Sequence, residues 1–357
     1  MSRQSNKEIY YISSFYWKNY NAASKAKMDI ERIFQSESFK PINLFKDGKN
    51  TRIFSLSKFF QFIIYSFFGG KYKNSTVFFQ NGTGIDAILS PFIKLAFRNG
   101  KRIIVIHDVE TIRLGRKIDF LREKIVFSKF THAICHSQEM ADFLMEKIGF
   151  KGQTIVLGFF DYLISKEITK NIDNNKLEFS KDTRFLIVYA GNLSKWKSGF
   201  ICKMAESGYS PKNYKLLLYG KGYDGVINEF LEIKGAYSPD ELPARIQGHF
   251  GLIWDGDDID KISGKTGEYL RYNSPHKASL YIASELPIIA WKGSAIFKLI
   301  EEYNIGFGVD SLLELESKLE NITPEQYETW RNNIEKLRNE IINGNRLRNV
   351  MKAIVSE

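Results

Sequence analysis

The residues of this chain that could take part in binding or catalysis lie where apolar runs end. The first group could bind a phosphate. The segment 189–195 (YAGNLSK) directly follows an apolar run at 185–188 (FLIV). Gly191 lets the backbone approach an anion closely, and Lys195 or Lys197 adds positive charge. A plain glycine turn explains the same residues equally well.

A second anion site is predicted at 273–277 (NSPHK), which leads into an apolar helical stretch. Pro275 is typical of a helix beginning, where backbone N–H groups lack partners inside the helix. These N–H groups together with Lys277 could hold a diphosphate. The alternative is an ordinary capped helix whose lysine is solvated.

Two carboxylates make the third group, in the segment 254–258 (WDGDD). Asp255 and Asp257 have the Asp-x-Asp spacing with which many nucleotide-sugar enzymes hold Mg²⁺ against phosphates. We expect no metal here, because Lys195 and Lys277 already offer positive charge to a phosphate. Binding of sugar hydroxyls, or a solvated loop, is the favoured interpretation of the pair.

One strand end in the first half carries a candidate general base. His107 and Asp108 follow the most apolar of the predicted strands (RIIVI). A histidine beside an aspartate at such a place could take a proton from a substrate. A structural histidine that bonds to loop carbonyls is the alternative. Dinucleotide-binding glycine motifs, Walker loops, nucleophile elbows and zinc-protease motifs are absent, which argues against the enzymes that use them.

Alternating β-rich runs and helical periods place these groups on parallel sheets. In the first half, strands are predicted at 7–13, 75–79, 101–107, 131–136 and 153–157, and helices at 22–34, 84–98, 117–129 and 137–148. After a polar stretch, strands are predicted at 185–189, 215–219, 250–254 and 287–290, with a helix at 277–284. The predicted organisation is an N-terminal domain (1–160), a linker (161–184), a C-terminal domain (185–323) and a helical tail (324–357). Ligands of such sheets bind at the carboxyl ends of the strands, so we expect the site in a cleft between the domains.

The composition is that of an ordinary globular protein with two domains. The chain has 357 residues, of which 43% are hydrophobic and 26% charged, and this balance disfavours disorder. Two cysteines, Cys135 and Cys202, are too few for a disulfide framework or a zinc site, as expected of an intracellular or redox-indifferent chain. No signal-peptide pattern opens the sequence, and the apolar run at 59–70 is too short to span a membrane.

The net charge of +10 is spread unevenly. Residues 1–160 hold 25 Lys and Arg against 13 Asp and Glu, whereas residues 161–357 hold 26 against 28. A basic first half indicates an anionic partner, which could be nucleic acid, an anionic membrane surface or a phosphate-bearing substrate. Nucleic acid is disfavoured because no nucleic-acid motif is present. Two stretches, 53–68 and 113–129, mix Lys and Arg with Phe, Ile and Leu, as in helices that lie on membrane headgroups. The alternative is that their apolar residues pack on the sheet and their basic residues are solvated.

Along most of its length the sequence resembles the bacterial galactofuranosyltransferases that build O-antigen and capsular polysaccharides, and the beta-1,6 enzymes above all. It is more distantly similar to the glucosyltransferases that extend the sugar on serine-rich-repeat adhesins. The matching runs, in chain order, are 106–108 (IHD), 160–163 (FDYL), 189–194 (YAGNLS), 251–257 (GLIWDGD), 263–264 (SG), Gly267, 269–270 (YL), Asn273, 275–277 (PHK), 279–281 (SLY) and 286–287 (LP).

The resemblance implies the GT-B fold, in which two Rossmann-like domains face a cleft, with the donor nucleotide in the C-terminal domain and the acceptor toward the N-terminal one. It implies these donor-binding residues: Lys277, with His276 in the same motif, for the diphosphate; Gly191, Asn192 and Lys195 on the other side of the phosphates; Tyr237 beside the uracil; Asp255 and Asp257 for sugar hydroxyls. One departure concerns the ribose. Leu280 stands where many GT-B enzymes have a ribose-binding glutamate, and Glu285 occupies a glycine position.

The activity that the resemblance implies is inverting transfer of galactofuranose from UDP-galactofuranose to a sugar hydroxyl of a lipid-linked precursor, through a β-1,6 linkage. Asp108 is the expected base and His107 the second candidate, and no metal or other cofactor is expected. The alternatives are a glucosyltransferase that uses UDP-glucose and a non-catalytic GT-B chaperone or scaffold. We expect the protein at the cytoplasmic face of the cell membrane, where an anionic lipid surface would hold it peripherally. A homo-oligomer is compatible with the sequence.

Overall fold

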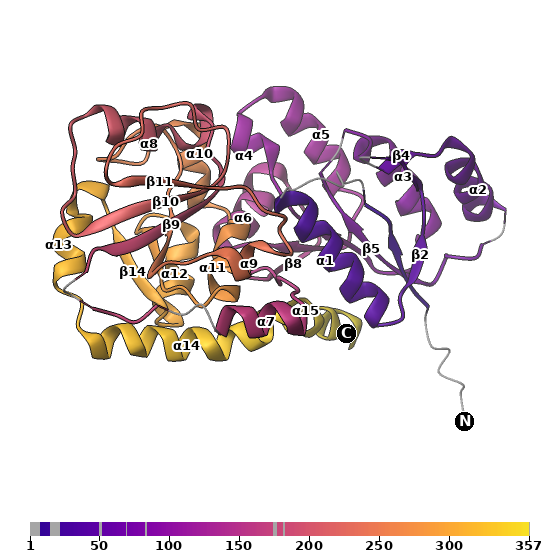
Figure 1. Ribbon diagram of the computed structural model, residues 1–357. Helices are drawn as coiled ribbons and strands as arrows, with labels where there is room; N and C mark the ends of the chain where they lie inside the picture. Colours follow the sequence, from indigo (N-terminus) through magenta and orange to yellow (C-terminus); the bar gives the residue numbers. More distant parts are fainter. Residues whose placement is uncertain are drawn as a thin grey trace. The chain divides into compact units, whose positions relative to one another are not determined.

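Two compact units divide the chain in the computed structural model, which describes residues 8–14, 22–49, 52–68, 70–82, 84–173, 177–180 and 183–356. Unit 1 comprises Met1–Leu157 together with Val350–Glu357, and unit 2 comprises Gly158–Asn349. Figure 1 shows the helices and strands of each unit. Lys7 of the first predicted strand, and residues 174–176 and 181–182 of the predicted linker, lie outside the described residues.

Unit 1 is built on a six-stranded parallel sheet with the spatial order β2-β1-β5-β6-β7-β8. Its central strands are mostly apolar because both faces of the sheet are covered, and β5, β7 and most of β6 are buried. The strands are β1 (Ile9–Ile12), β2 (Lys40–Ile42), β5 (Thr76–Gln80), β6 (Arg102–Val105), β7 (His132–Cys135) and β8 (Gln153–Val156).

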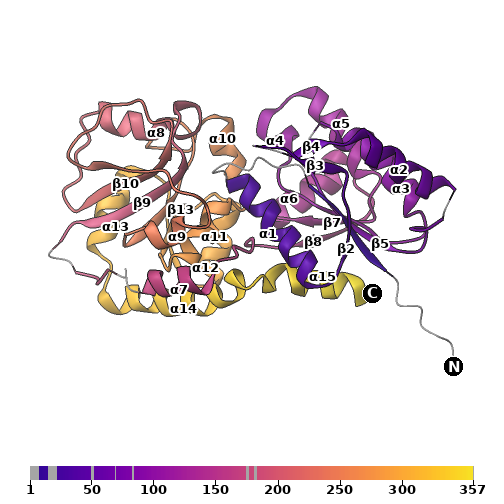
Figure 2. The same ribbon diagram turned by 45° about the vertical axis from the view of Figure 1, so that its right-hand side comes forward.

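The connections of unit 1 are helical, apart from a short antiparallel hairpin of β3 (Phe45–Asp47) and β4 (Arg52–Phe54). Helix α2 packs against α3, and α3 packs against α5; Figure 2 shows α2 and α3 side by side. The helices are α1 (Ala22–Ser36), α2 (Leu56–Phe67), α3 (Asp86–Ala96), α4 (Glu110–Leu114), α5 (Lys117–Phe127) and α6 (Gln138–Phe143), the last continued by a π-helical turn (Leu144–Ile148).

Unit 2 has a second six-stranded parallel sheet, in the order β11-β10-β9-β12-β13-β14. The first strand of this sheet, β9, has β10 on one side and β12 on the other. Strands β10 and β11 are thus added on one side of β9, and the later strands on the other side, which makes a switch point between β9 and β12. Such a switch point opens a crevice at the carboxyl ends of the two strands. The strands are β9 (Phe185–Asn192), β10 (Tyr214–Lys221), β11 (Leu231–Gly235), β12 (Phe250–Ile253), β13 (Ile288–Trp291) and β14 (Gly306–Val309).

Helices complete unit 2 and form the C-terminal region. Helix α14 begins after Thr323, whose side chain accepts a hydrogen bond from the Gln326 N–H, and it packs against α11. The helices are α7 (Lys166–Asp173), α8 (Lys195–Glu206), α9 (Leu242–Arg245), α10 (Gly264–Glu268), α11 (His276–Ala283), α12 (Ala295–Glu302), α13 (Leu315–Glu320), α14 (Pro324–Ile342) and α15 (Asn345–Ser356).

The predicted fold class, two parallel α/β units with a helical C-terminal region, is confirmed. Every predicted strand overlaps an observed one, and the predicted helices are present. The sequence did not predict β2, β3, β4, β11 or β14. These strands have three to five residues, and their sequences (KPI, FKD, RIF, LEIKG and GFGV) lack the continuous apolar run of a central strand.

Candidate functional site

A buried carboxylate, Asp255, lies just after the carboxyl end of β12, next to β9. Its Oδ1 accepts hydrogen bonds from Lys277 Nζ at 2.8 Å and from the Tyr189 hydroxyl at 3.0 Å, and its Oδ2 lies 3.1 Å from Lys197 Nζ. Lys277 Nζ also lies 4.2 Å from the centroid of the Tyr189 ring. The structure thus brings the three predicted groups of unit 2 together around one side chain.

The side chains of this cluster range from buried to partly exposed. The side chain is 3% exposed for Asp255, 9% for Lys277 and 30% for Lys197. Below them, the Tyr281 hydroxyl accepts from the Ala190 N–H and donates to the Leu252 carbonyl, which ties β9 to β12. The two lysines therefore stand on a fixed base and have their ammonium groups at the strands' carboxyl ends.

A break in α8 explains how Lys197 reaches Asp255. Ser198 departs from helical geometry, with φ −127° and ψ 37°. At this break Gly256 supplies the missing backbone partners: its N–H donates to the Lys197 carbonyl at 2.8 Å, and its carbonyl accepts from the Phe200 N–H at 3.0 Å. Gly256 has φ 107°, and a Cβ there would lie 2.3 Å from the Ser263 carbonyl oxygen, so only glycine fits.

Burial and ion pairing act against each other on these groups. Burial would raise the pKa of the Asp255 carboxyl, but Lys197 and Lys277 outweigh it and hold that pKa below its ordinary value. Burial lowers the pKa of the Lys277 ammonium, with Asp255 opposing the shift and Lys197 adding to it. Burial and Asp255 raise the pKa of the Tyr189 hydroxyl well above its ordinary value, so it stays a donor. One carboxylate between two ammonium groups leaves the cluster positive, which suits an anion such as a diphosphate.

The other residues of the 189–195 segment lie on the open side of the strand end. Gly191 has φ 139°, and a Cβ there would meet no atom within 4 Å. The exposed Asn192 accepts from the Ser194 N–H at 2.9 Å and from its hydroxyl at 2.5 Å. Lys195 is exposed, whereas Lys197 points to Asp255, because residues two positions apart in a helix lie about 200° apart around its axis. The sequence named both lysines; the structure selects Lys197 as the partner of Asp255.

Three further predicted residues are positioned by other neighbours. Tyr237 follows β11, and its ring centroid lies 6.4 Å from that of Tyr219. His276 begins α11, and its ring stacks on Tyr162 with centroids 4.9 Å apart. Asp257 is exposed, and its carboxylate accepts from a hydroxyl within its own loop. These three remain predicted site residues.

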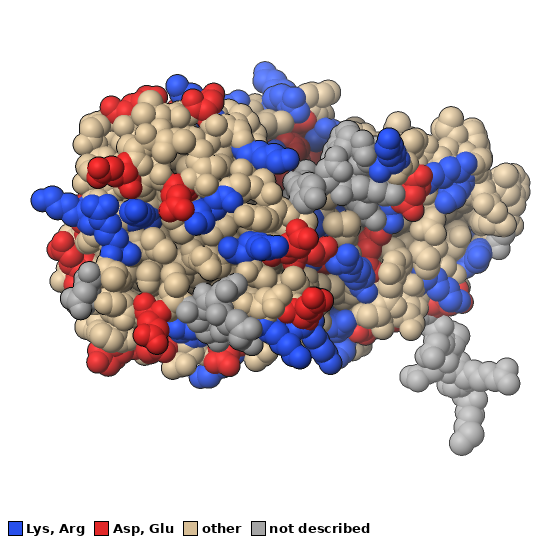
Figure 3. All heavy atoms as spheres, in the orientation of Figure 1, with Lys and Arg blue, Asp and Glu red and all other residues tan. Residues whose placement is uncertain are grey.

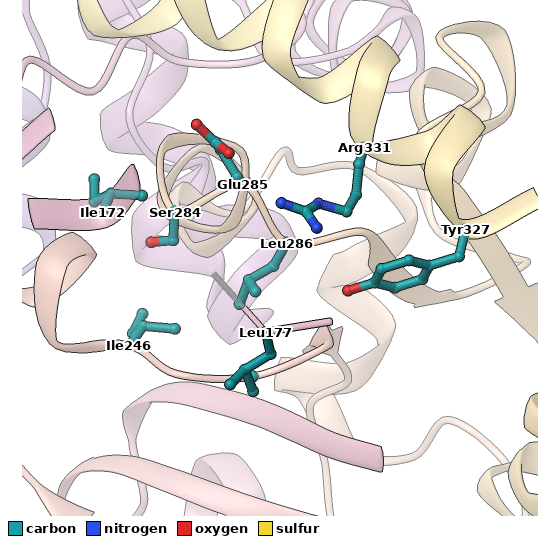
Figure 4. Close-up of a pocket in the computed structure, with 9 residues that line it drawn as sticks. Ile172, Leu177, Ile246, Ser284, Glu285, Leu286, Tyr327 and Arg331 are labelled. Carbon is teal, nitrogen blue, oxygen red and sulfur yellow. The ribbon is translucent and has the colours of Figure 1, made fainter. Parts of the chain in front are cut away.

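A small hollow of unit 2 lies at the opposite edge of the sheet, where strands begin (Figure 4). Glu285 there has φ 58°, and its carboxylate pairs with Arg338 Nη1 at 2.9 Å, so this side chain is held in place. Leu280, at the position of the ribose-binding glutamate of many GT-B enzymes, is buried and apolar. Parallel sheets bind ligands at their carboxyl edge, which points away from this hollow. Its lining residues are Ile172, Leu177, Ile246, Gly248, Ser284, Glu285, Leu286, Tyr327 and Arg331.

In unit 1, Asn81 at the end of β5 fixes the loop that carries the candidate bases. Its Oδ1 accepts from the His107 N–H at 2.6 Å, and its Nδ2 donates to the Asp108 carbonyl at 2.9 Å. His107 Nε2 lies 2.8 Å from Gln80 Oε1. The Asp108 side chain is one-third exposed, and its Oδ2 accepts from Arg113 Nη1 at 3.0 Å. Asn81 and Arg113 were not predicted as site residues, although Asn81 is a polar residue close to a predicted strand end.

Asp108 also lines an open hollow of unit 1. Its wall carries charges of both signs, so it offers hydrogen-bond donors and acceptors together, as the hydroxyls of a sugar require. Burial raises the pKa of two of its carboxyls, those of Glu110 and Glu123. The lining residues are Asn81, Gly82, Gly84, Asp86, Asp108, Glu110, Arg113, Leu114, Arg116, Arg122, Glu123, Val126 and Phe127.

Among the residues that the structure describes, no three His, Cys, Asp or Glu side chains are grouped as metal ligands would be. Within the same part of the chain, no helix combines the length and the apolar character that crossing a membrane requires. Cys135 and Cys202 are buried and form no disulfide.

Sequence comparison relates the chain to sugar transferases over its full length. It is 28% identical over 355 residues to the beta-1,6-galactofuranosyltransferase WbbI of Escherichia coli strain K12, covering 98% of this chain and 99% of the relative. It is 26% identical over 238 residues to glucosyltransferase 3 of Streptococcus parasanguinis, covering 66% of this chain and 64% of that protein.

Solved structures show the same fold. Sucrose-phosphate synthase of Thermosynechococcus elongatus superposes with a TM-score of 0.61 at 10% identity, covering 98% of this chain and 100% of that one. Anabaena HepE in complex with UDP and glucose superposes with a TM-score of 0.58 at 14% identity, covering 99% and 100%. The two parallel α/β units are thus those of the GT-B fold.

Family assignment follows from two matches that together span most of the chain. Residues 9–159 match the N-terminal domain of the glucosyltransferase 3-like family, and residues 187–354 match its C-terminal domain. The order of the two domains is the order of the two sheets described above. The chain therefore belongs to the glucosyltransferase 3-like family of glycosyltransferases.

Proposed function

We propose that this protein is an inverting glycosyltransferase that moves galactofuranose from UDP-galactofuranose to a sugar hydroxyl of a lipid-linked polysaccharide precursor, forming a β-1,6 linkage. The Escherichia coli relative, alike over nearly the whole chain, is named for that sugar and that linkage. UDP-galactofuranose carries its sugar in the α configuration, so a β product requires inversion at the anomeric carbon.

The observation that carries the proposal is the pair of lysines held by Asp255 at the switch point of unit 2. As the bond between sugar and UDP breaks, negative charge grows on the departing diphosphate. Lys277 and Lys197, together with the N–H groups that begin α11, are positioned to stabilise that charge. An ammonium has three donors, so each lysine retains donors beyond the one that Asp255 accepts.

The acceptor hydroxyl must lose its proton, and we assign this step to Asp108. Its carboxylate lines the hollow of unit 1, where an acceptor sugar would find donors and acceptors for its hydroxyls. Arg113 orients the carboxylate at 3.0 Å. His107 is the second candidate, and its Nε2 is engaged with Gln80.

A glucosyltransferase that uses UDP-glucose is the second candidate function. It is favoured by the family description and by the streptococcal glucosyltransferase 3 relative. The two functions share the diphosphate site and differ in the pocket that surrounds the sugar.

The test is a panel of UDP-sugars with release of UDP as the readout. The purified protein is offered UDP-galactofuranose, UDP-galactopyranose and UDP-glucose, each with and without a synthetic glycan acceptor. We expect acceptor-dependent release from UDP-galactofuranose alone. Turnover with UDP-glucose only would overturn the donor assignment. UDP binding without turnover of any donor would favour a non-catalytic role.

The proposal includes binding to the membrane surface through unit 1, and α2 supplies the first support. Leu56, Phe60, Ile64 and Phe67 follow one face of this helix, and each is more than half exposed. The only charged residue of α2 is Lys58, whose Nζ donates to the Phe45 carbonyl. In Figure 3 the surface around α2, at the right of the view, is largely uncharged, with Lys and Arg beside it. An exposed helix face that is apolar and uncharged suits insertion among lipid headgroups.

Helix α5 supplies the second support. Its exposed side carries Ile118, Leu121 and Ile125 between Lys117 and Lys124. Its two acidic residues are buried: one binds arginines of the same helix region, and the other accepts from the first N–H groups of α4. The outward charges are therefore all positive, as an anionic lipid surface requires. Phe127, which the sequence placed on this surface, is buried instead.

Co-sedimentation with vesicles tests the membrane claim. We expect binding to vesicles that contain phosphatidylglycerol at low salt, weaker binding at high salt, and little binding to phosphatidylcholine alone. The double variant Lys117→Glu/Lys124→Glu should lose binding, and Lys318→Glu, a charge reversal at an exposed site of unit 2, is the matched control. Protein that stays in the supernatant with anionic vesicles at low salt would contradict the claim.

A further inference from the structure

We propose that Asp255 is a positioning residue, which holds Lys197 and Lys277 together at the switch point of unit 2 and does not itself contact the donor. The inference rests on the proposed function, because it concerns the same diphosphate site. It departs from the role in reading sugar hydroxyls that the resemblance implied for this residue.

The hydrogen bonds of Asp255 are the first support. Both carboxylate oxygens are engaged, Oδ1 with Lys277 and the Tyr189 hydroxyl and Oδ2 with Lys197. The side chain is 3% exposed. A group that reads the hydroxyls of a sugar needs an oxygen that reaches the ligand, and here protein donors occupy the carboxylate from three elements.

The second support is the need of two lysines for a counter-ion. Two ammonium groups on one carboxylate repel each other, and a buried charge without a partner is strongly unfavourable. Asp255 meets this need for both lysines and still leaves one positive charge for the ligand. It can therefore preorganise the site without cancelling the charge that a diphosphate requires.

Removal of the carboxylate should change how the site responds to pH. The groups that face Lys277 are Asp255 from the loop after β12, Lys197 from α8 and the Tyr189 phenol from β9, with the Tyr281 phenol below. Without Asp255, only burial and Lys197 act on Lys277, and both lower its pKa. Lys277 would then lose its proton at a lower pH than in the wild type, and the site would lose its charge as the pH rises.

The experiment compares UDP affinity of the wild type and Asp255→Asn by calorimetry from pH 7 to pH 9. We expect the variant to bind UDP about 10-fold to 100-fold more weakly at pH 7. Its affinity should fall further by up to about 10-fold per pH unit above the lowered lysine pKa, while the wild type changes little. Asp255→Glu should restore part of the affinity and the flat profile. Asp258→Asn, which removes the Lys203 ion pair of the same loop, is the matched control and should leave both unchanged.

The outcomes separate the possible failures. Wild-type UDP affinity and a flat pH profile in Asp255→Asn would overturn the positioning role. Unchanged UDP affinity with an altered preference among UDP-sugars would show that Asp255 contacts the sugar. If the wild type binds no UDP, the proposed function fails before the variant is considered.

Tyr189→Phe keeps the test decisive if Asp255→Asn does not fold. This variant removes one hydrogen bond to Asp255 and leaves no buried charge unpaired. We expect its UDP affinity to fall about threefold or more with an unchanged preference among donors. An affinity equal to that of the wild type would overturn the proposal.

Discussion

Each unit has a cluster in which one buried carboxylate holds two cations, and the cluster on Asp255 of unit 2 encloses one of its cations, whereas the cluster on Asp119 of unit 1 does not. In unit 1, Asp119 of α5 is 1% exposed and binds Arg116 and Arg122, whose side chains are 58% and 30% exposed. In unit 2, Asp255 binds Lys197 and Lys277, and the latter is nearly as enclosed as its partner.

The difference separates two kinds of anion recognition. A solvated cation is screened by water and salt, so it favours a diffuse, reversible contact. A buried cation interacts in a medium of lower effective dielectric constant, so the same charge acts more strongly on a ligand that reaches it. We therefore expect the Asp119 cluster to meet anions at the surface of unit 1 and the Asp255 cluster of unit 2 to bind one anionic group tightly.

The largest expected effect tests whether unit 1 contributes chemistry as well as a surface. Asp108→Asn removes the proposed base and keeps the size of the side chain. Transfer should fall by about 10²-fold to 10⁴-fold, the range for loss of general base catalysis, while UDP affinity stays at the wild-type value. Initial rates with saturating acceptor, together with calorimetry for UDP, check this.

A matched variant sharpens the assignment of the base. His107→Gln removes the ring that contacts Gln80 and should reduce transfer far less than Asp108→Asn does. Unchanged turnover in Asp108→Asn would end the assignment, and a larger loss in His107→Gln would transfer the role to the histidine.

The next effect addresses the enclosed lysine directly. Lys277→Ala removes a preorganised positive charge from the diphosphate site, so UDP binding should weaken and transfer should fall by about 10²-fold or more. Arg122→Ala, which removes one of the two cations on Asp119, should leave UDP affinity unchanged. Equal effects of the two variants on UDP affinity would break the contrast between the two clusters.

A smaller effect concerns stability, because unit 2 buries another carboxyl. Asp161 accepts from the Arg346 and Leu347 N–H groups at the start of α15, and burial raises its pKa to about 7 from an ordinary 3.8. A raised carboxyl pKa means that stability is fully present below about pH 4 and declines as the pH rises to about 7. Between pH 5 and pH 8 the wild type should lose about 2 to 3 kcal/mol more than Asp161→Asn. Denaturant unfolding at both pH values measures this, and equal losses would contradict it.

The smallest expected effect is that of metal removal. Lysines and helix N–H groups neutralise the diphosphate in the proposed site, so EDTA should leave the transfer rate unchanged. Rates after dialysis against EDTA, with and without added Mg²⁺ or Mn²⁺, check this. A strict requirement for either metal would instead give Asp257 and its neighbours a role as ligands.

Much of the fold could be predicted because central strands of buried sheets are continuous apolar runs. The strands at 101–107 and 185–189, with polar residues directly behind them, led to both candidate sites. The edge strands β2 and β11 could not be predicted in this way, because one side of an edge strand is open and tolerates residues such as Lys40 and Glu232.

The sequence predicted at which strand ends the site residues lie, but it did not predict which of their side chains contact one another. Asp255 and Asp257 look equivalent in the sequence, yet one lies under the lysines and the other in an exposed loop. What separates them is the backbone of Gly256, which fills the break in α8. That break depends on a long-range pairing between α8 and the loop after β12, and no local pattern in the sequence encodes it.

Unit 1 is formed by two segments that lie far apart in the chain, which has a consequence for folding during synthesis. Its last segment, from Val350 onward, contains the buried Met351 and Ile354, and Lys101 donates to the Ile354 carbonyl. A ribosome synthesises these residues only after the whole of unit 2. All strands of the unit 1 sheet are therefore made early, but unit 1 lacks its last helical segment until nearly two hundred further residues are synthesised, whereas unit 2 is contiguous and can fold as soon as it emerges.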